Sequence, residues 1–268
     1  MTDSVFMADL TWVEYQRRLE EEDAIVLVPV GAVEQHGWHL PLGCDFMLAN
    51  EMCRRIAERV GGVVAPPFQY GYKSQIRTGG GNHYCGTTSL DGQTLMALVG
   101  DVVKEIARHG AKKIAVIDGH YENEWFLTEG LHLAIRELEA AGVNDVRVLK
   151  MRYCERIKQE TLDEFFPHGF PGLDLEHAAL LETSLMLYLF PHLVHMDRLP
   201  DDGPAEFPPY DLYPPNPDWV PPSGALSVAE GSSAEIGRRL TEECVELCVN
   251  ALTQEFRAEG EASVRVAS

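Results

Sequence analysis

Two short groups of histidine and acidic residues have the types and spacing that metal binding requires. Glu34 and His36 lie two positions apart, Asp45 follows nine residues after His36, and His120 and Glu122 repeat the spacing of two. Divalent zinc and manganese both accept imidazole nitrogen and carboxylate oxygen, and one carboxylate can bridge two ions. The five residues therefore predict a site for two divalent metal ions, with zinc or manganese as the cofactor.

The spacing within each pair strengthens this interpretation. Residues two positions apart in an extended segment point to the same side, so each pair can converge on one point. The alternative is that these are polar loop residues or a hydrogen-bonded core histidine, which a single histidine would favour. Two pairs with equal spacing, each just beyond an apolar segment, favour the metal site.

The segments before the two pairs have the pattern of buried strands. Residues 24–30 and 113–117 are short, apolar and rich in β-branched side chains, as in strands covered on both faces. Helices are predicted at 46–60, 91–110 and 122–141, and further strands at 62–65 and 146–151. This alternation predicts an α/β fold, a three-layer α/β/α sandwich around a mainly parallel sheet. The metal site then lies at the carboxyl ends of the strands, where such sheets bind ligands.

Three other segments depart from this alternation. Residues 69–90 are rich in Gly, Tyr, Ser and Thr and predict a loop that lines the site. Residues 200–222 hold nine of the sixteen prolines, which predicts an extended arm without regular structure. Its four aromatic residues favour an arm packed on the domain or on a neighbouring subunit over a disordered linker. The sequence Ser232 to Glu235 predicts a capping box that begins a final helix.

Size and charge bound the class of protein. A chain of 268 residues with 45% hydrophobic content fits a single domain over 1–268, with two small domains as the alternative. The net charge of −20 argues against nucleic-acid and anionic-membrane partners. Residues resembling a signal peptide or a membrane span are not found, which predicts a cytoplasmic location. The six cysteines form no Cys-x-x-Cys pair, which suits reduced thiols.

Five motifs in the same order resemble the creatininase (creatinine amidohydrolase) family. They lie at 28–37, which reads VPVGAVEQHG, and at 69–75, 79–83, 86–92 and 119–123. The similarity spans nearly the whole chain. It implies a metal-dependent hydrolase that opens a small cyclic amide, creatinine or a related ring, and a homo-oligomer that is usually a hexamer.

The resemblance also divides the ligands between two ions that share Asp45. Glu34, Asp45 and His120 hold one ion, while His36, Asp45 and Glu122 hold the other. The carboxylate of Glu122 also assists the attacking water.

A general acid for the departing ring nitrogen is expected at His177. Opening a cyclic amide requires such an acid, and an imidazole near a metal suits it. The alternative for a histidine at a helix start is capping or packing, and the resemblance favours catalysis. His39 is expected to support a ligand rather than bind metal, and His83 is a further candidate. Glu182 is expected to support the site or to be structural. Substrate contacts are expected from six residues: Thr78, Tyr121, Cys154, Leu173, Asp174 and Glu176.

The chain departs from the family at two of these positions. Cys154 and Leu173 stand where the family carries tryptophans that close over the flat creatinine ring, and neither can stack as an indole does. This change favours the same reaction on a different or less planar ring. A cyclic diketo-inositol of the 3-dehydro-scyllo-inosose type, cleaved between carbons, is the leading alternative, and a non-catalytic metal-binding oligomer is the second.

Overall fold

A four-stranded parallel sheet forms the centre of the molecule. The computed structural model describes residues 4–256. The strand order is β2 (Val63–Val64), β1 (Val26–Val30), β3 (Lys113–Asp118) and β4 (Arg147–Arg152), and each neighbouring pair is parallel. The register places Val30 beside Asp118, and Asp118 beside Arg152. The strands β1, β3 and β4 therefore end together at one edge, as the sequence predicts.

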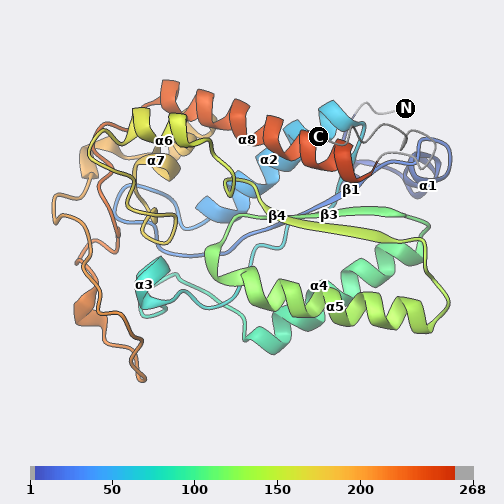
Figure 1. Ribbon diagram of the computed structural model, residues 1–268, viewed down its shortest axis with the longest axis horizontal. Coiled ribbons are helices and arrows are strands. Elements are labelled where there is room, and N and C mark those ends of the chain that lie inside the picture. The colour runs from blue at the N-terminus through green and yellow to red at the C-terminus, as the bar shows by residue number, and fades with distance from the viewer. Residues whose placement is uncertain (1–3, 257–268) are drawn as a thin grey trace, which may run out of the picture.

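Helices cover both faces of this sheet (Figure 1). The helices α4 (Gly92–Arg108) and α5 (Glu124–Ala140) lie on one face, and α2 (Cys44–Val60) and α8 (Ala234–Glu255) lie on the other. The helix α7 (Leu180–Leu189) packs against α2 and α8. This arrangement confirms the three-layer α/β/α sandwich.

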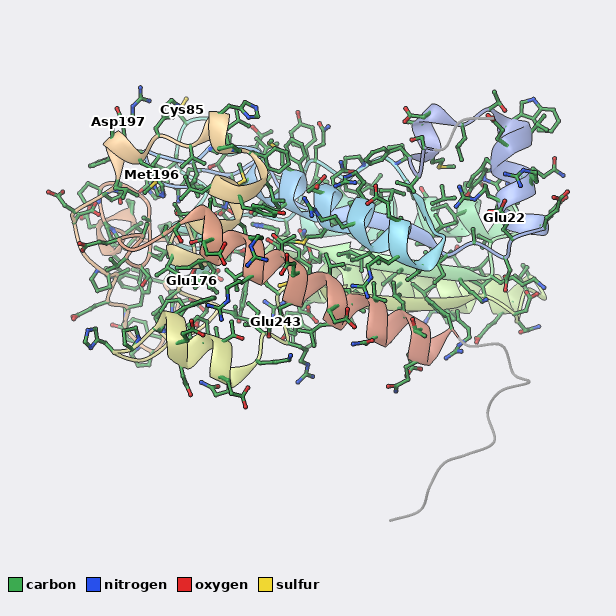
Figure 2. All side chains as sticks on the ribbon, turned by 90° about the horizontal axis from the view of Figure 1, so that it is seen from above. Glu22, Cys85, Glu176, Met196, Asp197 and Glu243 are labelled. Carbon is green, nitrogen blue, oxygen red and sulfur yellow. The ribbon has the colours of Figure 1, made fainter. Side chains whose placement is uncertain are left out.

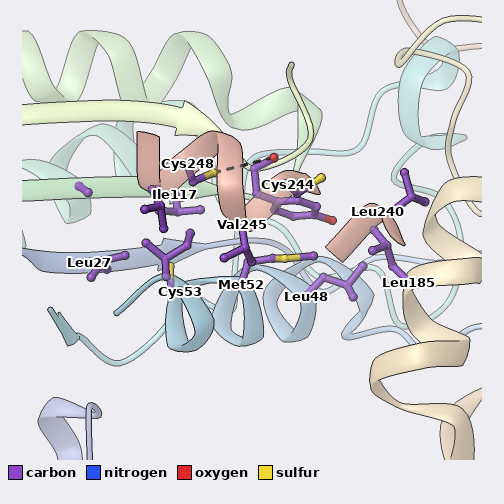
Figure 3. Close-up of a cluster of buried hydrophobic side chains, with 14 of the residues drawn as sticks. Leu27, Leu48, Met52, Cys53, Ile117, Leu185, Leu240, Cys244, Val245 and Cys248 are labelled. Atoms are coloured by element: carbon purple, nitrogen blue, oxygen red, sulfur yellow. Dashed lines mark hydrogen bonds between the residues drawn. The ribbon is translucent and has the colours of Figure 1, made fainter. Parts of the chain in front are cut away.

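Alternate side chains of β1 enter different layers of the core. Leu27 belongs with Ile117 to the cluster under α2 and α8 (Figure 3), whereas Val26 and Val28 belong to the cluster under α4 and α5. Successive side chains of a strand point to opposite faces of the sheet, which explains this division. Because all five residues of β1 are buried, the strand reads as one continuous apolar run.

Two helix starts differ from the prediction, and both changes affect the site. The helix α2 begins at Cys44 rather than at residue 46, so Asp45 lies in its first turn, where the helix dipole favours a carboxylate. The chain after His120 is not extended, because residues 121–123 form the 3-10 turn η2 (Tyr121–Asn123) before α5. The expected alternation of His120 and Glu122 on an extended segment is therefore wrong.

The final helix begins one residue later than a capping box at Ser232 requires. Ser233 is the capping residue, and its Oγ accepts a hydrogen bond from the Ile236 amide at 3.2 Å. The carboxylate of Glu235 instead binds Arg238. The predicted helix is thus confirmed, whereas the predicted capping box between Ser232 and Glu235 is wrong.

The proline-rich segment has one regular element, the short 3-10 helix η5 (Pro217–Trp219). Ala205 and Val220 are buried with Leu226 and Ile76 in a small apolar cluster. These two residues of the arm therefore pack against other parts of the chain.

The remaining described elements are short. A four-residue helix, α3 (Ile76–Gly79), interrupts the predicted loop at 69–90. Viewed from above (Figure 2), Glu176 lies toward the same end of the molecule as Cys85 and Met196, away from Glu22. Within residues 4–256 no helix is long and apolar enough to cross a membrane. The other elements are α1 (Trp12–Glu20), α6 (Gln159–Phe165), η1 (Met7–Asp9), η3 (Pro191–Leu193) and η4 (Met196–Arg198).

Candidate metal centre and active site

Four of the five predicted ligands gather where β1 and β3 end. Glu34 and His36 lie in the loop after β1, His120 lies two residues after β3, and Asp45 comes from the first turn of α2. Each of the four is at most 2% exposed. The fold therefore brings charged and polar side chains from three segments of the chain into one buried centre.

The carboxylate of Asp45 lies between the two imidazoles. Its Oδ1 is 2.9 Å from His36 Nε2, and its Oδ2 is 3.1 Å from His120 Nδ1. The second neighbour of His120 Nδ1 is Glu34 Oε2, also at 3.1 Å. One oxygen of Asp45 thus faces each histidine, as a bridging carboxylate would.

Backbone carbonyls fix which nitrogen of each histidine carries its proton. His36 Nδ1 lies 3.1 Å from the Glu34 carbonyl, and His120 Nε2 lies 3.0 Å from the Tyr72 carbonyl. A carbonyl only accepts, so these nitrogens donate. In the neutral rings, His36 Nε2 and His120 Nδ1 then hold the lone pairs that face the carboxylates, as in metal sites whose ligands are held by such outer contacts.

The donor set fits a divalent cation. Glu34 Oε1, His36 Nε2 and Asp45 Oδ2 are buried and have no hydrogen-bond partner within the described residues. Burial raises the pKa of Glu34 to about 7. Burial lowers the pKa of His36, but the carboxylates of Asp45 and Glu182 outweigh it and raise that pKa to about 10. Protons therefore compete with a cation for the same atoms.

The groups of residues that the structure brings together match the ligands expected for the first ion more closely than those expected for the second. Glu34, Asp45 and His120 offer ligand atoms within 4.8 Å of one another, and so do Glu34, His36 and His177. A third such group joins His36 and Asp45 with Cys44, a thiol whose pKa burial raises well above its usual value.

Glu122 lies beside these groups rather than within them. Its Oε1 accepts hydrogen bonds from Thr78 Oγ1 at 2.6 Å and from the Gln75 amide at 3.0 Å. Its Oε2 lies 3.5 Å from His120 Nε2. The assignment of Glu122 to the second ion therefore stays a prediction.

His177 reaches the same centre from the chain just before α7. Its ring lies 4.4 Å from the ring of His36, and its Nε2 lies 2.9 Å from Gln35 Nε2. Burial and the neighbouring His36 lower the pKa of His177 well below its usual value. Ala178, the next residue, has a positive φ of 55°, and its amide donates to Glu182 Oε2 at 2.6 Å.

The expected substrate residues line two adjoining cavities. The larger cavity, of about 1110 Å³, is lined in part by Thr78, Glu122 and Asp174. The smaller cavity, of about 60 Å³, is lined in part by Cys154, Leu173 and Glu176. Tyr121 lines both, and Arg152 lies 4.5 Å from the centre of its ring.

The structure places the other candidate histidines outside the ligand groups. His39 is fully buried, with Nε2 2.9 Å from Thr183 Oγ1, whereas His83 is exposed. His39 therefore contacts α7, and its expected support of a ligand stays a prediction.

Sequence reasoning missed two polar residues that hold the centre, Gln35 and Asn123. Glu182, which was expected to support the site or to be structural, has its Oε2 3.7 Å from His36 Nε2. Asn123 is fully buried, accepts from the Tyr72 amide at 2.8 Å and donates to Asp118 at 2.9 Å. It thereby fixes the residue whose carbonyl faces His120. Its place beside Glu122 in the 119–123 motif was the available signal.

Comparison with known sequences points to one family. The family model described as creatinine amidohydrolase matches residues 8–252. The creatinine amidohydrolase of Pseudomonas putida is 47% identical over 257 residues, covering 96% of this chain and 99% of the relative. A mycofactocin precursor peptide peptidase of Mycobacterium ulcerans is 30% identical over 85% of this chain and 84% of the relative. A 3-dehydro-scyllo-inosose hydrolase of Thermotoga maritima is 26% identical over 76% of this chain and 62% of the relative.

Solved structures agree in fold over most of the chain. A mutant creatininase of the Zn-Zn type has a TM-score of 0.94 at 46% identity, and a manganese creatininase has 0.93 at 47%. A mutant creatininase complexed with creatine has 0.93 at 46%. Each covers 96% of this chain and 100% of the solved chain.

Proposed function

This chain belongs to the creatininase family, and we propose that the ring it opens is creatinine. The observation that carries the proposal is the 47% identity to a creatinine amidohydrolase across 96% of this chain and 99% of that relative. The other relatives named above, with different substrates in their names, are 30% identical or less.

The chain is a metal-dependent amidohydrolase with two divalent metal ions as its cofactor. Such ions, when bound, polarise an amide carbonyl and make a water molecule more acidic. We propose that Glu34, Asp45 and His120 hold one ion. His36, Asp45 and Glu122 hold the other, with Asp45 as the bridge.

Two side chains carry the protons in the proposed reaction. Thr78 and the Gln75 amide hold Oε1 of Glu122, and the Glu122 carboxylate takes a proton from the attacking water. The water oxygen bonds to the carbonyl carbon, and the bond from that carbon to the ring nitrogen breaks. His177 gives a proton to the departing nitrogen. The proton taken by Glu122 then replaces the one given by His177, so one water molecule is consumed and both side chains return to their starting states.

The two residues that replace the tryptophans of the family favour weaker binding of a flat ring. Cys154 and Leu173 line the small cavity, and neither offers a face for stacking. This observation keeps a second candidate, a less planar or more polar ring opened by the same centre. It also keeps the cyclic diketo-inositol as a ring to be tested.

Purified metal-loaded protein should be assayed on creatinine, hydantoins, formamidopyrimidines and oxidised inositols. The proposal expects hydrolysis of creatinine with a higher kcat/KM than for the other rings. A higher kcat/KM on another ring would transfer the assignment to that ring. Absence of turnover on every cyclic amide would overturn the proposal.

We also propose a cytoplasmic homo-oligomer, a hexamer by family resemblance. Two features support this proposal. Trp12 and Trp125 are each 76% exposed, and large exposed aromatic side chains are typical of contact surfaces. The six cysteines are free thiols, as in reducing compartments. Light scattering on the purified protein tests the subunit number, and a monomer would contradict it.

A further inference from the structure

Asn123 occupies the N-cap position of α5, but its side chain does not cap that helix. Asparagine at this position commonly accepts hydrogen bonds from the first amides of a helix. Here the side chain is fully buried and makes no such bond. The contacts that it makes instead lie on the side of the metal centre.

The amide group of Asn123 uses all of its hydrogen-bonding atoms. Its Oδ1 accepts from the Tyr72 amide at 2.8 Å, and its Nδ2 donates to Asp118 Oδ1 at 2.9 Å and to the Gly31 carbonyl at 3.3 Å. An amide N–H only donates and a carbonyl only accepts, so these partners fix the orientation of the group. One side chain thus joins the ends of β1 and β3 to the loop that contains Tyr72.

Two of these partners also hold His120. Asp118 Oδ1 accepts a hydrogen bond from the His120 main-chain amide at 3.1 Å, and the Tyr72 carbonyl lies 3.0 Å from His120 Nε2. The first contact holds the main chain of His120, and the second holds its ring. Asn123 therefore contacts both residues that orient this ligand.

The backbone beside Tyr72 is packed too closely against Asn123 to move inward. A Cβ at Gly71 would lie 2.5 Å from the Gly31 carbonyl and 2.7 Å from Asn123 Oδ1, so only glycine fits there. The Leu90 amide donates to the Gly71 carbonyl at 2.8 Å. The fold thus holds this loop at the distance that its hydrogen bond to Asn123 requires.

We propose that Asn123 is a positioning residue for His120. By holding Tyr72 and Asp118, its side chain fixes the main chain and the ring of this ligand in the orientation that binds the ion. Contacts outside the ligand shell commonly orient histidine ligands and raise metal affinity, and here one amide supports two of them. The inference rests on the proposed function, in which His120 holds the first ion.

The affinity for metal is tested with Asn123→Ala, which removes all three hydrogen bonds. Metal-free protein is titrated with zinc in competition with a chelating indicator, which gives a Kd for each of the two ions. We expect the Kd of one ion to rise by about 10- to 100-fold. Wild-type Kd values for both ions would overturn the proposal.

The matched control is Leu138→Ala, which removes a buried apolar side chain near the far end of α5. It lowers stability without touching the centre, so both Kd values should stay within about twofold of the wild type. An equal rise in Kd in this control would show that the loss in Asn123→Ala reflects general destabilisation, and it would overturn the proposal.

Hydrogen exchange on the wild-type protein tests the contact without any Asn123 variant. In metal-loaded protein, the Tyr72 amide should exchange at least about tenfold more slowly than the amide of the exposed Tyr70. Equal rates would overturn the proposal. Neither the Kd values nor the exchange rates require turnover. A chain that binds two ions and opens no creatinine would therefore refute the proposed function and leave the role of Asn123 standing.

Discussion

Asp45 is the residue on which the metal centre depends most. Its two oxygens face one imidazole each, at 2.9 and 3.1 Å, and both imidazoles donate from their far nitrogens to carbonyls. Lone pairs of buried carboxylates and imidazoles repel one another unless a cation or a proton lies between them. The arrangement at this one residue therefore explains why the centre favours a bound cation or, in its absence, a proton.

Replacing Glu122 by glutamine should abolish most of the hydrolysis. The amide keeps the shape that accepts from Thr78 but cannot take the proton of water, so we expect kcat to fall by about 10² to 10⁴-fold. Steady-state assays on creatinine measure the loss. Glu129→Gln, at an exposed position of α5, is the control, and a wild-type rate in Glu122→Gln would remove this carboxylate from the mechanism.

The buried His39 should make the folded protein sensitive to acid. Burial and the neighbouring His36 lower its pKa from 6.5 to about 4, so the unfolded chain binds more protons between these pH values. Stability is therefore complete above about pH 6.5 and falls as the pH decreases toward 4. His39→Gln, which keeps a polar atom near Thr183, should flatten this dependence in urea unfolding curves measured across that range. An equally steep dependence in the variant would refute the role of His39.

At the scale of elements, the periodicity of the chain predicts the sheet and its helical layers. Apolar β-branched segments end just before Glu34 and His120, which is enough to place both at one edge of a parallel sheet. The turn after His120 was not predictable, because the contacts of Glu122 with Gln75 and Thr78 join residues 47 and 44 positions apart. For the same reason, the orientation of Gln35 toward Gly224 could not be read from local sequence.

The loops that carry Cys154 and Leu173 should control substrate affinity. Introducing tryptophan at both positions restores stacking surface over a planar ring, worth about 0.5–1.5 kcal/mol per ring. We expect KM for creatinine to fall by about two- to tenfold for each tryptophan, with little change in kcat. Cys85→Trp, at an exposed cysteine, controls for the added indole. An unchanged KM in the double variant would show that this cavity does not bind the ring.

At the scale of the whole molecule, metal binding and folding should be linked. The centre joins the loops after β1 and β3 to the first turn of α2, so ions that bind only the folded chain stabilise all three together. Such binding contributes about 2.7 kcal/mol for each ion held at 100 times its Kd. Chelation should lower Tm, and added zinc or manganese should restore it. Asp45→Asn should show a much smaller metal-dependent shift, and a shift equal to that of the wild type would contradict the bridging role.

The acidity of the chain is consistent with this linkage. A net charge of −20 attracts divalent cations toward the molecule and keeps it soluble. It has no part in choosing the ring, which is decided by the residues around the two cavities.

The most direct test of the account is a metal titration of activity. Metal-free protein is loaded stepwise with zinc or manganese, and creatinine hydrolysis is measured against the number of ions bound per chain. We expect no turnover without metal and a rate that rises until two ions are bound per chain. A chain that holds two ions and leaves creatinine intact, or one that hydrolyses it without metal, would contradict it.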